Sequence, residues 1–320
     1  MSRLRTFLAS ALLGSVLNLT STASAQLGSI VDQFHLPPDY FSRFGSLQAV
    51  VSNTDGYGVR YFPLPFSQDI RLSLVKAPTY VDVGLTTRVN DTTFAIGKFY
   101  NVPTFEITRN PGKGVQFSGV LRGDNGFSSF SGGYAFTLAK DRFRILNNVG
   151  VAYKGDKAVP YTQSELSTGY GQTFGKVNTY VAATGRYYAF PLQREGQASA
   201  DFYLAATTAL APGLSVHASH FERFVTGTVA IADYGLGRYE SSYLEATYRL
   251  PASWPSSTFA LGGVRSRVSR DWTNDYTYVY GDLFFKSDLL PTMVGPSIGY
   301  RFGPGNAEGV WLISLAALNK

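Results

Sequence analysis

The sequence predicts an all-β fold, an antiparallel transmembrane β-barrel of about 12 strands, with a range of about 12 to 18, preceded by an N-terminal segment of shorter strands. Three observations lead to this fold class. The chain begins with an apolar leader, its body alternates between polar and apolar residues over long stretches, and turn-forming residues separate these stretches at a spacing near 17 residues, which is longer than in soluble β-proteins.

Composition excludes several other classes. Of the 320 residues, 16% are charged and 15% aromatic, so the chain carries enough apolar side chains to offset the entropy of ordering. Beyond the leader no apolar run is long enough for a membrane-spanning helix; the densest late stretch is Val310–Leu318. The chain has no cysteine, which excludes disulfides, thiolate metal sites and a cysteine nucleophile.

Residues 1–25 are predicted to be a signal peptide. Arg3 and Arg5 precede the apolar stretch Phe7–Leu17, and Ala23-Ser24-Ala25 matches a small-x-small cleavage site. The mature chain would begin at Gln26 and be exported. Loss of the two leader arginines lowers the formal net charge from +6 to +4, too small a charge to indicate nucleic-acid binding.

Residues 26–112 are expected to form an N-terminal β-segment. Turn residues come closer together here, and the candidate strands are short: 47–52, 57–62, 70–75, 80–87, 93–99 and 104–108. Three interpretations stay open. The segment is periplasmic, it fills the lumen of the barrel, or its hairpins are additional barrel strands.

Residues 113–320 are expected to form the transmembrane barrel. Phe143, Ile145 and Val149 alternate with Arg144 and Asn148, and similar two-residue periods recur toward the C-terminus. A membrane strand needs about 9 to 11 residues, and in lipid only a closed barrel pairs every backbone group of a β-chain. Aromatic pairs near strand ends, such as Tyr187-Tyr188 and Phe284-Phe285, match interfacial girdles. The alternative is a secreted, soluble β-protein with an aromatic core.

Alternation also predicts which side chains line the lumen. Mixed charges on inward positions either solvate and select small solutes or cross-link a barrel that conducts nothing. The predicted lining residues are Arg144, Asp201, Tyr203, Glu245, Arg249, Arg265, Arg267, Tyr276, Tyr278, Tyr280, Asp282 and Arg301. The longest interruption, Phe224–Arg238, is expected to be a loop that faces outside or constricts the lumen.

His217-Ala218-Ser219-His220 is the one candidate for covalent chemistry. His217 and Ser219 share a strand face, as a His-activated serine requires. The element resembles the His-x-Ser of outer-membrane phospholipase A, which implies a lipid hydrolase using Ser219 and His217. That family continues with Asn-Gly, whereas His220 and Phe221 follow here, and polar lining residues explain the pair better. We expect no metal, because the chain has 3 histidines in all and His220 falls on the face opposite His217. We expect no cofactor, because the sequence has no Gly-rich phosphate loop of the Walker type.

The leader, the alternation and the aromatic placement together resemble bacterial outer-membrane β-barrel proteins of the porin type. Tyr61-Phe62-Pro63-Leu64-Pro65 followed by Phe221–Gly227 also resembles the barrel of the lipopolysaccharide-assembly outer-membrane protein. The chain departs from many barrels by ending in Leu318-Asn319-Lys320 and not in an aromatic residue. The resemblance implies a Gram-negative-type envelope and, as partners, outer-membrane lipids, the barrel-insertion machinery and small solutes; a homo-oligomer is left open.

The leading functional hypothesis is a passive channel or transporter for small solutes without enzymatic activity. The alternatives are a barrel for lipid or glycolipid transport or assembly, which would open laterally between its terminal strands, and an outer-membrane lipid hydrolase.

Overall fold

The computed structural model describes residues 48–52, 56–64, 67–76, 80–99, 101–109, 111–124, 127–230, 237–251, 256–268, 276–286, 292–303 and 306–319. The predicted signal peptide and residues 26–47 lie outside these ranges. Among the described residues, no helix is long and apolar enough to cross a membrane.

The described residues form eighteen β-strands in one sheet. The strands are β1 (Gln48–Ser52), β2 (Gly56–Leu64), β3 (Ser67–Lys76), β4 (Val81–Val89), β5 (Thr92–Phe99), β6 (Val102–Arg109), β7 (Gly114–Arg122), β8 (Phe127–Leu138), β9 (Phe143–Lys154), β10 (Lys157–Phe174), β11 (Val177–Phe190), β12 (Glu195–Ala211), β13 (Leu214–Gly227), β14 (Tyr239–Arg249), β15 (Ser256–Val268), β16 (Tyr276–Phe285), β17 (Thr292–Gly303) and β18 (Asn306–Asn319).

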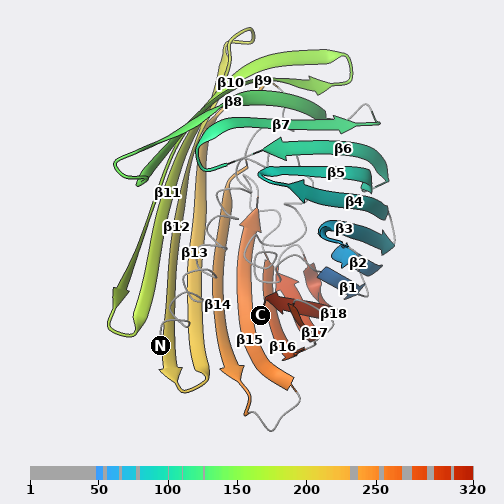
Figure 1. Cartoon of the computed structure of the whole chain (residues 1–320), viewed down its shortest axis with the longest axis vertical. Helices are drawn as coiled ribbons and strands as arrows, with labels where there is room; N and C mark the ends of the chain where they lie inside the picture. Colours follow the sequence, from blue (N-terminus) through green and yellow to red (C-terminus); the bar gives the residue numbers. More distant parts are fainter. Residues whose placement is uncertain are drawn as a thin grey trace.

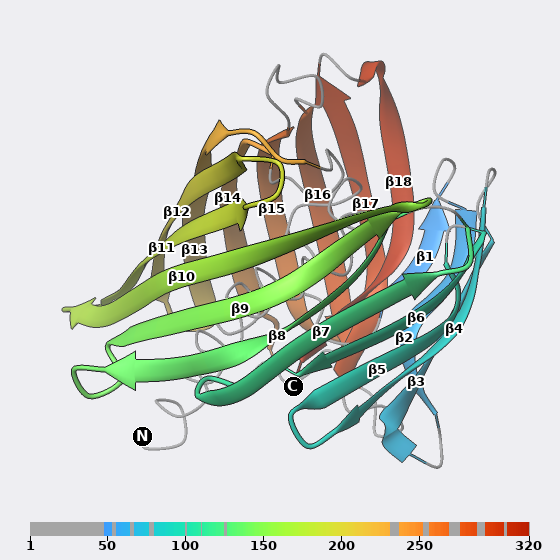
Figure 2. The same cartoon turned by 90° about the horizontal axis from the view of Figure 1, so that it is seen from above.

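Each strand pairs antiparallel with the next one along the chain. The first strand, β1, pairs with β2 and also with β18, where Ala49 lies opposite Leu315. β1 and β18 accordingly lie side by side in Figures 1 and 2. The order of pairing therefore returns to its start, and the sheet is a barrel with an inner and an outer face.

Burial follows the two-residue period of the strands. In β12, Asp201, Tyr203 and Ala205 are buried, whereas Phe202 and Leu204 between them are about half exposed. A closed sheet buries only its inner face, so the buried set points inward. The exposed outer face carries large apolar side chains on many strands, among them Val149, Leu166, Leu244, Leu261, Val279, Ile298, Trp311 and Ile313.

The twelve strands predicted after residue 113 are present as β7–β18, and the total of eighteen is at the upper end of the predicted range. The six shorter strands predicted before residue 112 are β1–β6. They pair continuously with one another, and β6 pairs with β7 over Thr104–Arg109. Strand pairing therefore continues without a break across residue 112, where the sequence predicts a boundary between two segments. Short strands extend a sheet as well as long ones do when their register matches the neighbour's.

Two details of the sequence interpretation need correction. The loop expected from Phe224 starts later, because β13 continues to Gly227 and Phe224 pairs with Ala200. Of the aromatic pairs expected in girdles, one member points inward: Tyr188 is buried beside exposed Tyr187, and Phe284 is buried beside Phe285. Neighbouring residues of a strand point to opposite faces, so a girdle can use only one of each pair.

Candidate functional site

A row of alternating charges crosses the inner face of five consecutive strands. We call it the charge belt; its members, one from each of β9 to β13, are Arg144, Glu165, Arg186, Asp201 and Arg223. Each occupies an inward position of its strand, and the register of the antiparallel pairs brings neighbouring members within contact distance.

Glu165 joins the first three strands of the charge belt. Arg144 Nη1 donates to Glu165 Oε1 at 2.9 Å, and Arg186 Nε donates to Glu165 Oε2 at 2.8 Å. Both carboxylate oxygens are therefore engaged by arginines. Such charge-assisted hydrogen bonds are about twice as strong as neutral ones.

Asp201 joins the last three strands in the same way. Arg186 Nη1 donates to Asp201 Oδ2, while Arg223 Nε and Nη2 donate to Oδ1 and Oδ2 at 2.8 and 3.0 Å. The Arg223 guanidinium also lies 5.6 Å from the centre of the Phe221 ring on the same strand, within cation–π range.

The charge belt extends beyond β9 through Arg144. Its Nη2 donates to Gln116 Oε1 on β7 at 3.1 Å, and its Nε donates to the carbonyl oxygen of Gly112 at 3.3 Å. The Arg144 side chain thus reaches across β8. This end of the belt is the more open one, with 16% of the Arg144 side chain exposed against 6% for Arg223 at the other end and 2% for Arg186 at the centre.

Burial makes mutual pairing necessary in the charge belt. A charge removed from water is costly unless it is paired and hydrogen-bonded, and here every carboxylate meets at least two arginine nitrogens. Three arginines against two carboxylates leave one net positive charge. The interior wall formed by β9–β13 is therefore both cross-linked and weakly cationic.

A second inner cluster, which we call the phenol cluster, is formed by Tyr243, Glu245, Tyr278 and Tyr280 on β14 and β16. Glu245 Oε2 accepts hydrogen bonds from the Tyr243 and Tyr280 hydroxyls at 2.7 and 2.8 Å. The rings of Tyr278 and Tyr280 are stacked with their centres 5.5 Å apart. This wall places an acidic group among phenols, in contrast to the cationic wall of the charge belt.

An apolar cluster lies on the inner face of β9–β11, near the ends joined by the β9–β10 turn. Ala152, Val159, Tyr161, Tyr188 and Phe190 form a buried cluster, against which Val229 and Ala230 of the segment after β13 pack. Two hydrogen bonds hold this segment: Lys157 Nζ donates to the Ala230 carbonyl at 3.2 Å, and the Thr228 amide donates to the Gly196 carbonyl at 2.9 Å. Val229 and Ala230 therefore pack against the inner face. Residues 231–236 of the expected loop lie outside the described part of the structure.

The structure places most of the predicted lining residues on the inner face. Those with buried or partly buried inward side chains are Arg144, Asp201, Tyr203, Glu245, Tyr278, Tyr280, Asp282 and Arg301. By the alternation of β14, Arg249 occupies an inward position, but its side chain is exposed because it is the last residue of the strand. The side chains of Arg267 and Tyr276 lie outside the described part of the structure.

The two faces of β15 are the reverse of the prediction. Arg265 is predicted to line the lumen, but its side chain is exposed and it lies opposite the outward Ser242, whereas Ala260, on the other face of β15, is buried. The phenol cluster crowds this face: a Cβ on Gly262 would lie 2.5 Å from the Tyr280 hydroxyl, so this inward position suits only glycine. The hydropathy pattern does not reveal this crowding.

Sequence reasoning missed Glu165, Arg186 and Arg223, three of the five members of the charge belt. Arg223 shares the parity of His217 and Ser219 and directly precedes Phe224, where the predicted loop begins. Arg186 directly precedes Tyr187 and Tyr188, a predicted girdle pair. The period-two signal was present for Arg186, which alternates with the outward residues Val181 and Tyr187. It was weaker for Arg223, because the outward residues that precede it, His220 and Glu222, are polar.

The histidine–serine element lies in β13, and His217 is engaged with other groups. Its Nδ1 is 2.8 Å from the Thr207 hydroxyl oxygen, and its ring centre lies 5.5 Å from that of Tyr243. Ser219 is buried on the same face, and His220 points to the other face, where its Nδ1 lies 2.9 Å from the Ser242 hydroxyl oxygen. Within the described ranges, no three side chains of metal-ligand type are grouped as a metal site would need.

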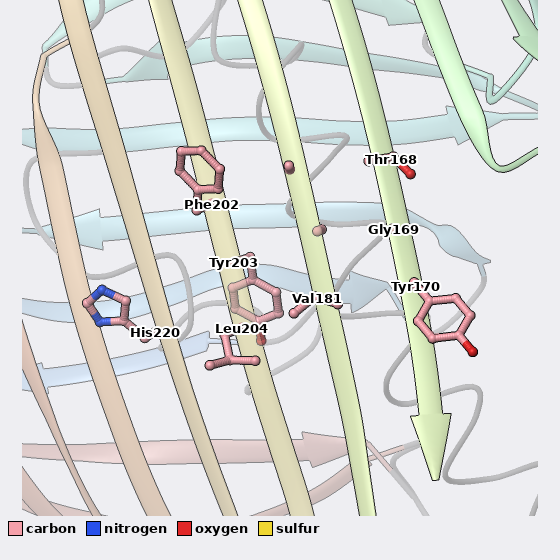
Figure 3. Close-up of a pocket in the computed structure, with 10 residues that line it drawn as sticks. Thr168, Gly169, Tyr170, Val181, Phe202, Tyr203, Leu204 and His220 are labelled. Carbon is pink, nitrogen blue, oxygen red and sulfur yellow. The ribbon is translucent and has the colours of Figure 1, made fainter.

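A shallow hollow lies on the outer face over β10–β13. Figure 3 shows Phe202 and Leu204 of β12, Tyr170 of β10 and His220 of β13 around it. Its lining is almost wholly apolar, and Phe202 and Leu204 are outward residues. The hollow is a feature of the barrel exterior and is separate from the charge belt.

No family model matches the chain, and no curated protein matches it. Among solved structures, the chain is similar to the outer-membrane protein OpdK of Pseudomonas aeruginosa, with a TM-score of 0.45, 11% identity, and coverage of 85% of this chain and 96% of that one. It is similar to a BenF-like porin of Pseudomonas fluorescens Pf-5 (TM-score 0.40, 12% identity, 82% and 85% covered). It is also similar to Pseudomonas aeruginosa OccK2, solved with glucuronate (0.38, 12%, 79% and 86%).

Proposed function

We propose that the chain is a bacterial outer-membrane β-barrel that acts as a passive channel for small solutes. The observation that carries the proposal is the division of the closed sheet into an apolar, exposed outer face and an inner face with charged and phenolic clusters. A soluble protein does not expose so extensive an apolar surface, whereas a barrel in lipid requires it.

The outer face supports a membrane location. Its large apolar residues occur on strands all around the ring, from Val83 on β4 to Ile313 on β18. Aromatic residues also contact each other there: Tyr300 lies 4.9 Å from Trp311 between ring centres, and Phe130 lies 6.4 Å from Tyr153. Such rings suit the boundary between hydrocarbon and headgroups.

The orientation follows from strand parity. Odd-numbered strands run away from the end where β1 begins, and even-numbered strands return to it, so β18 finishes there too. The long connection between Gly227 and Tyr239 follows an odd strand and lies at the opposite end. Because long loops of such barrels are extracellular, the end that holds the start of β1 and the end of β18 would face the periplasm.

The lumen-lining role is proposed for the inward residues of the predicted set, enlarged by Glu165, Arg186 and Arg223. Opposed charge on the two walls, cationic at the charge belt and acidic at the phenol cluster, would orient polar solutes that carry charge or hydroxyl groups. Thr228–Ala230, which packs on the apolar cluster near the extracellular end, would form the constriction.

The test has two steps. The protein from the outer-membrane fraction, run unboiled in a detergent gel, should migrate faster than the boiled protein, and in planar bilayers it should give discrete conductance steps. A heat shift without conductance would contradict the channel hypothesis but still support a closed barrel. Recovery in the soluble fraction without a heat shift would contradict both the channel and the membrane barrel.

The alternative of lipid or glycolipid transport is favoured by one observation. The seam between the terminal strands involves β1, the shortest strand, and pairs it with β18 at Ala49 and Leu315. A disulfide between A49C and L315C in this cysteine-free chain would lock the seam. A channel should conduct as before with the seam locked, whereas lipid transfer through a lateral opening should stop until the disulfide is reduced.

The proposal assigns no catalytic residue. A hydrolase would need His217 to activate Ser219, and the described contacts of His217 are with Thr207 and Tyr243. The discriminating assay is phospholipid hydrolysis in mixed micelles. Activity that disappears in Ser219→Ala with an unchanged heat shift would favour the hydrolase. The proposal also implies delivery by the barrel-insertion machinery and an outer face covered by lipids or by a second copy.

A further inference from the structure

One segment of β10 lacks a neighbour on one side. β10 pairs with β9 only as far as Thr168, which lies opposite Phe143, whereas its pairing with β11 continues to Phe174 opposite Val177. Gly169–Phe174, which we call the overhanging edge, therefore has β11 on one side and no described strand on the other. Figures 1 and 2 show the β10–β11 hairpin projecting past the turn that joins β8 and β9.

The overhanging edge offers a row of backbone hydrogen-bonding groups. In an antiparallel sheet, N–H and C=O groups alternate between the two neighbours, so some of those in Gly169–Phe174 are directed to the empty side. All its residues are exposed. The segment reads Gly-Tyr-Gly-Gln-Thr-Phe, without the lysine, proline or acidic residue with which free edges are usually protected.

The unpaired backbone groups determine the position of the overhanging edge relative to the membrane. These groups cannot lie in the hydrocarbon layer, where each unsatisfied group costs several kcal/mol. The overhanging edge must therefore stand in water. It belongs to the C-terminal end of an even-numbered strand, so it is on the side where β1 begins and β18 ends.

The two faces of the overhanging edge differ. On one face, Tyr170 and Phe174 are more than half exposed, at 57% and 59%. Figure 3 shows Tyr170 at the end of β10, with its ring pointing away from β11. On the other face, the Tyr180 ring lies beside Gly169 and Gly171. A strand added at this edge would meet exposed aromatic rings on one face and the Tyr180 ring on the other.

We propose that the overhanging edge binds an extended polypeptide segment of a periplasmic protein, which adds as an antiparallel strand in the place that β9 vacates. Its periplasmic position rests on the proposed function. Only another strand matches alternating donors and acceptors along an edge, and side chains at every second position set specificity in this mode of binding. The ligand would carry apolar or aromatic residues at alternate positions, facing Tyr170 and Phe174.

A second copy of the chain fits this edge less well. Copies in one membrane share their orientation, so the axis relating them runs along the membrane normal. That rotation brings two β10 edges together in parallel, whereas antiparallel pairing would need one copy inverted in the membrane. Parallel pairing is also slightly less stable per residue. A lipid lacks the repeated backbone donors and acceptors.

The experiment uses the absence of cysteine in the chain. The probe is a peptide with the sequence of residues 177–184, the segment that pairs with the other side of this edge, carrying cysteine in place of Thr179. The full chain with Gln172→Cys, in detergent, is oxidised with the peptide, and the mixed disulfide is measured by mass. The control is Ser164→Cys, an exposed position on the same face of β10, flanked by Asn147 on β9 and Tyr187 on β11.

We expect roughly tenfold more cross-link at residue 172 than at residue 164, because only the overhanging edge has room for another strand. Moving the cysteine along the peptide should give yields that alternate with a period of two. Equal yields at the two positions, or yields without alternation, would overturn the proposal.

Hydrogen exchange supplies a readout that needs no substitution. A cysteine-free peptide of residues 177–184 should slow exchange at alternate amides within Gly169–Phe174 of the wild-type chain. Unchanged exchange, or uniform slowing of the whole hairpin, would contradict strand addition. Neither measurement depends on conductance, so a chain that binds the peptide but passes no current would overturn the channel and leave the docking site.

Discussion

Asp201 holds Arg223 with both carboxylate oxygens, through Nε at 2.8 Å and Nη2 at 3.0 Å. The planar guanidinium fork matches the carboxylate, so two hydrogen bonds fix the relative position of β12 and β13. Because Asp201 also accepts from Arg186, one carboxylate ties together three strands. The charge belt is thus a continuous cross-strand connection, as well as the source of one net positive charge inside the barrel.

The first prediction concerns the centre of the charge belt. Arg186→Met should lower the free energy of unfolding by about 3 to 5 kcal/mol, because it leaves Glu165 and Asp201 without the arginine between them. The measurement is urea unfolding of the barrel in lipid vesicles. Arg144→Met is the control, and its effect should be smaller, since Arg144 lies at the more open end of the belt. If Arg186→Met and Arg144→Met lose the same free energy of unfolding, the centre of the belt is not more important for stability than its open end.

The second prediction tests whether the charge belt acts on permeating ions. Asp201→Asn raises the net charge of the belt by one and should shift the reversal potential in a KCl gradient toward anion selectivity. Arg223→Gln lowers it by one and should shift the potential in the opposite direction by a similar amount. The variants must first show the wild-type heat shift. Two folded variants with unchanged reversal potentials would mean that permeating ions do not sense the belt.

Much of the fold was predictable because alternation is a local property. The strands that the sequence predicts after residue 113 are all present, since each inward or outward choice is repeated several times within one strand. Closure was less accessible. The pairing of the five-residue strand β1 with β18 depends on a contact between the first and the last described strand, and no local pattern encodes such a contact.

The candidate site was predictable in part for the same reason. Parity predicts that Asp201, Glu245 and Tyr280 face inward, and they lie on the inner face. Parity does not predict their partners, because the register between strands decides which inward residues meet. Arg265 shows the limit of parity itself. On β15, the small residues Ala260 and Gly262 face inward and leave room for Tyr280. Parity therefore predicts the wrong face for Arg265, because the apolar side of this strand is its inner side.

The third prediction tests the lipid-facing side. Leu244 is exposed on the outer face of β14, and Leu244→Arg should reduce stability in vesicles by about 2 to 4 kcal/mol, as expected for a cation in the hydrocarbon layer. Ser242→Arg is the matched control: it is on the same face two residues away, in the row with His220 and Arg265, and should cost less. Equal small effects would indicate that this face is in contact with water.

The fourth prediction concerns the inward segment Thr228–Ala230. Lys157 Nζ donates to the Ala230 carbonyl, and Lys157→Met removes this hydrogen bond while keeping much of the side chain's length. The segment would still pack through Val229, so we expect more frequent transitions between conductance levels in single-channel recordings, with the heat shift unchanged. The control is Lys176→Met, at the turn between β10 and β11, which also removes one positive charge but lies far from the constriction. Its single-channel recordings should resemble those of the wild type. If Lys157→Met and Lys176→Met give identical traces, Thr228–Ala230 is not the element that limits the current.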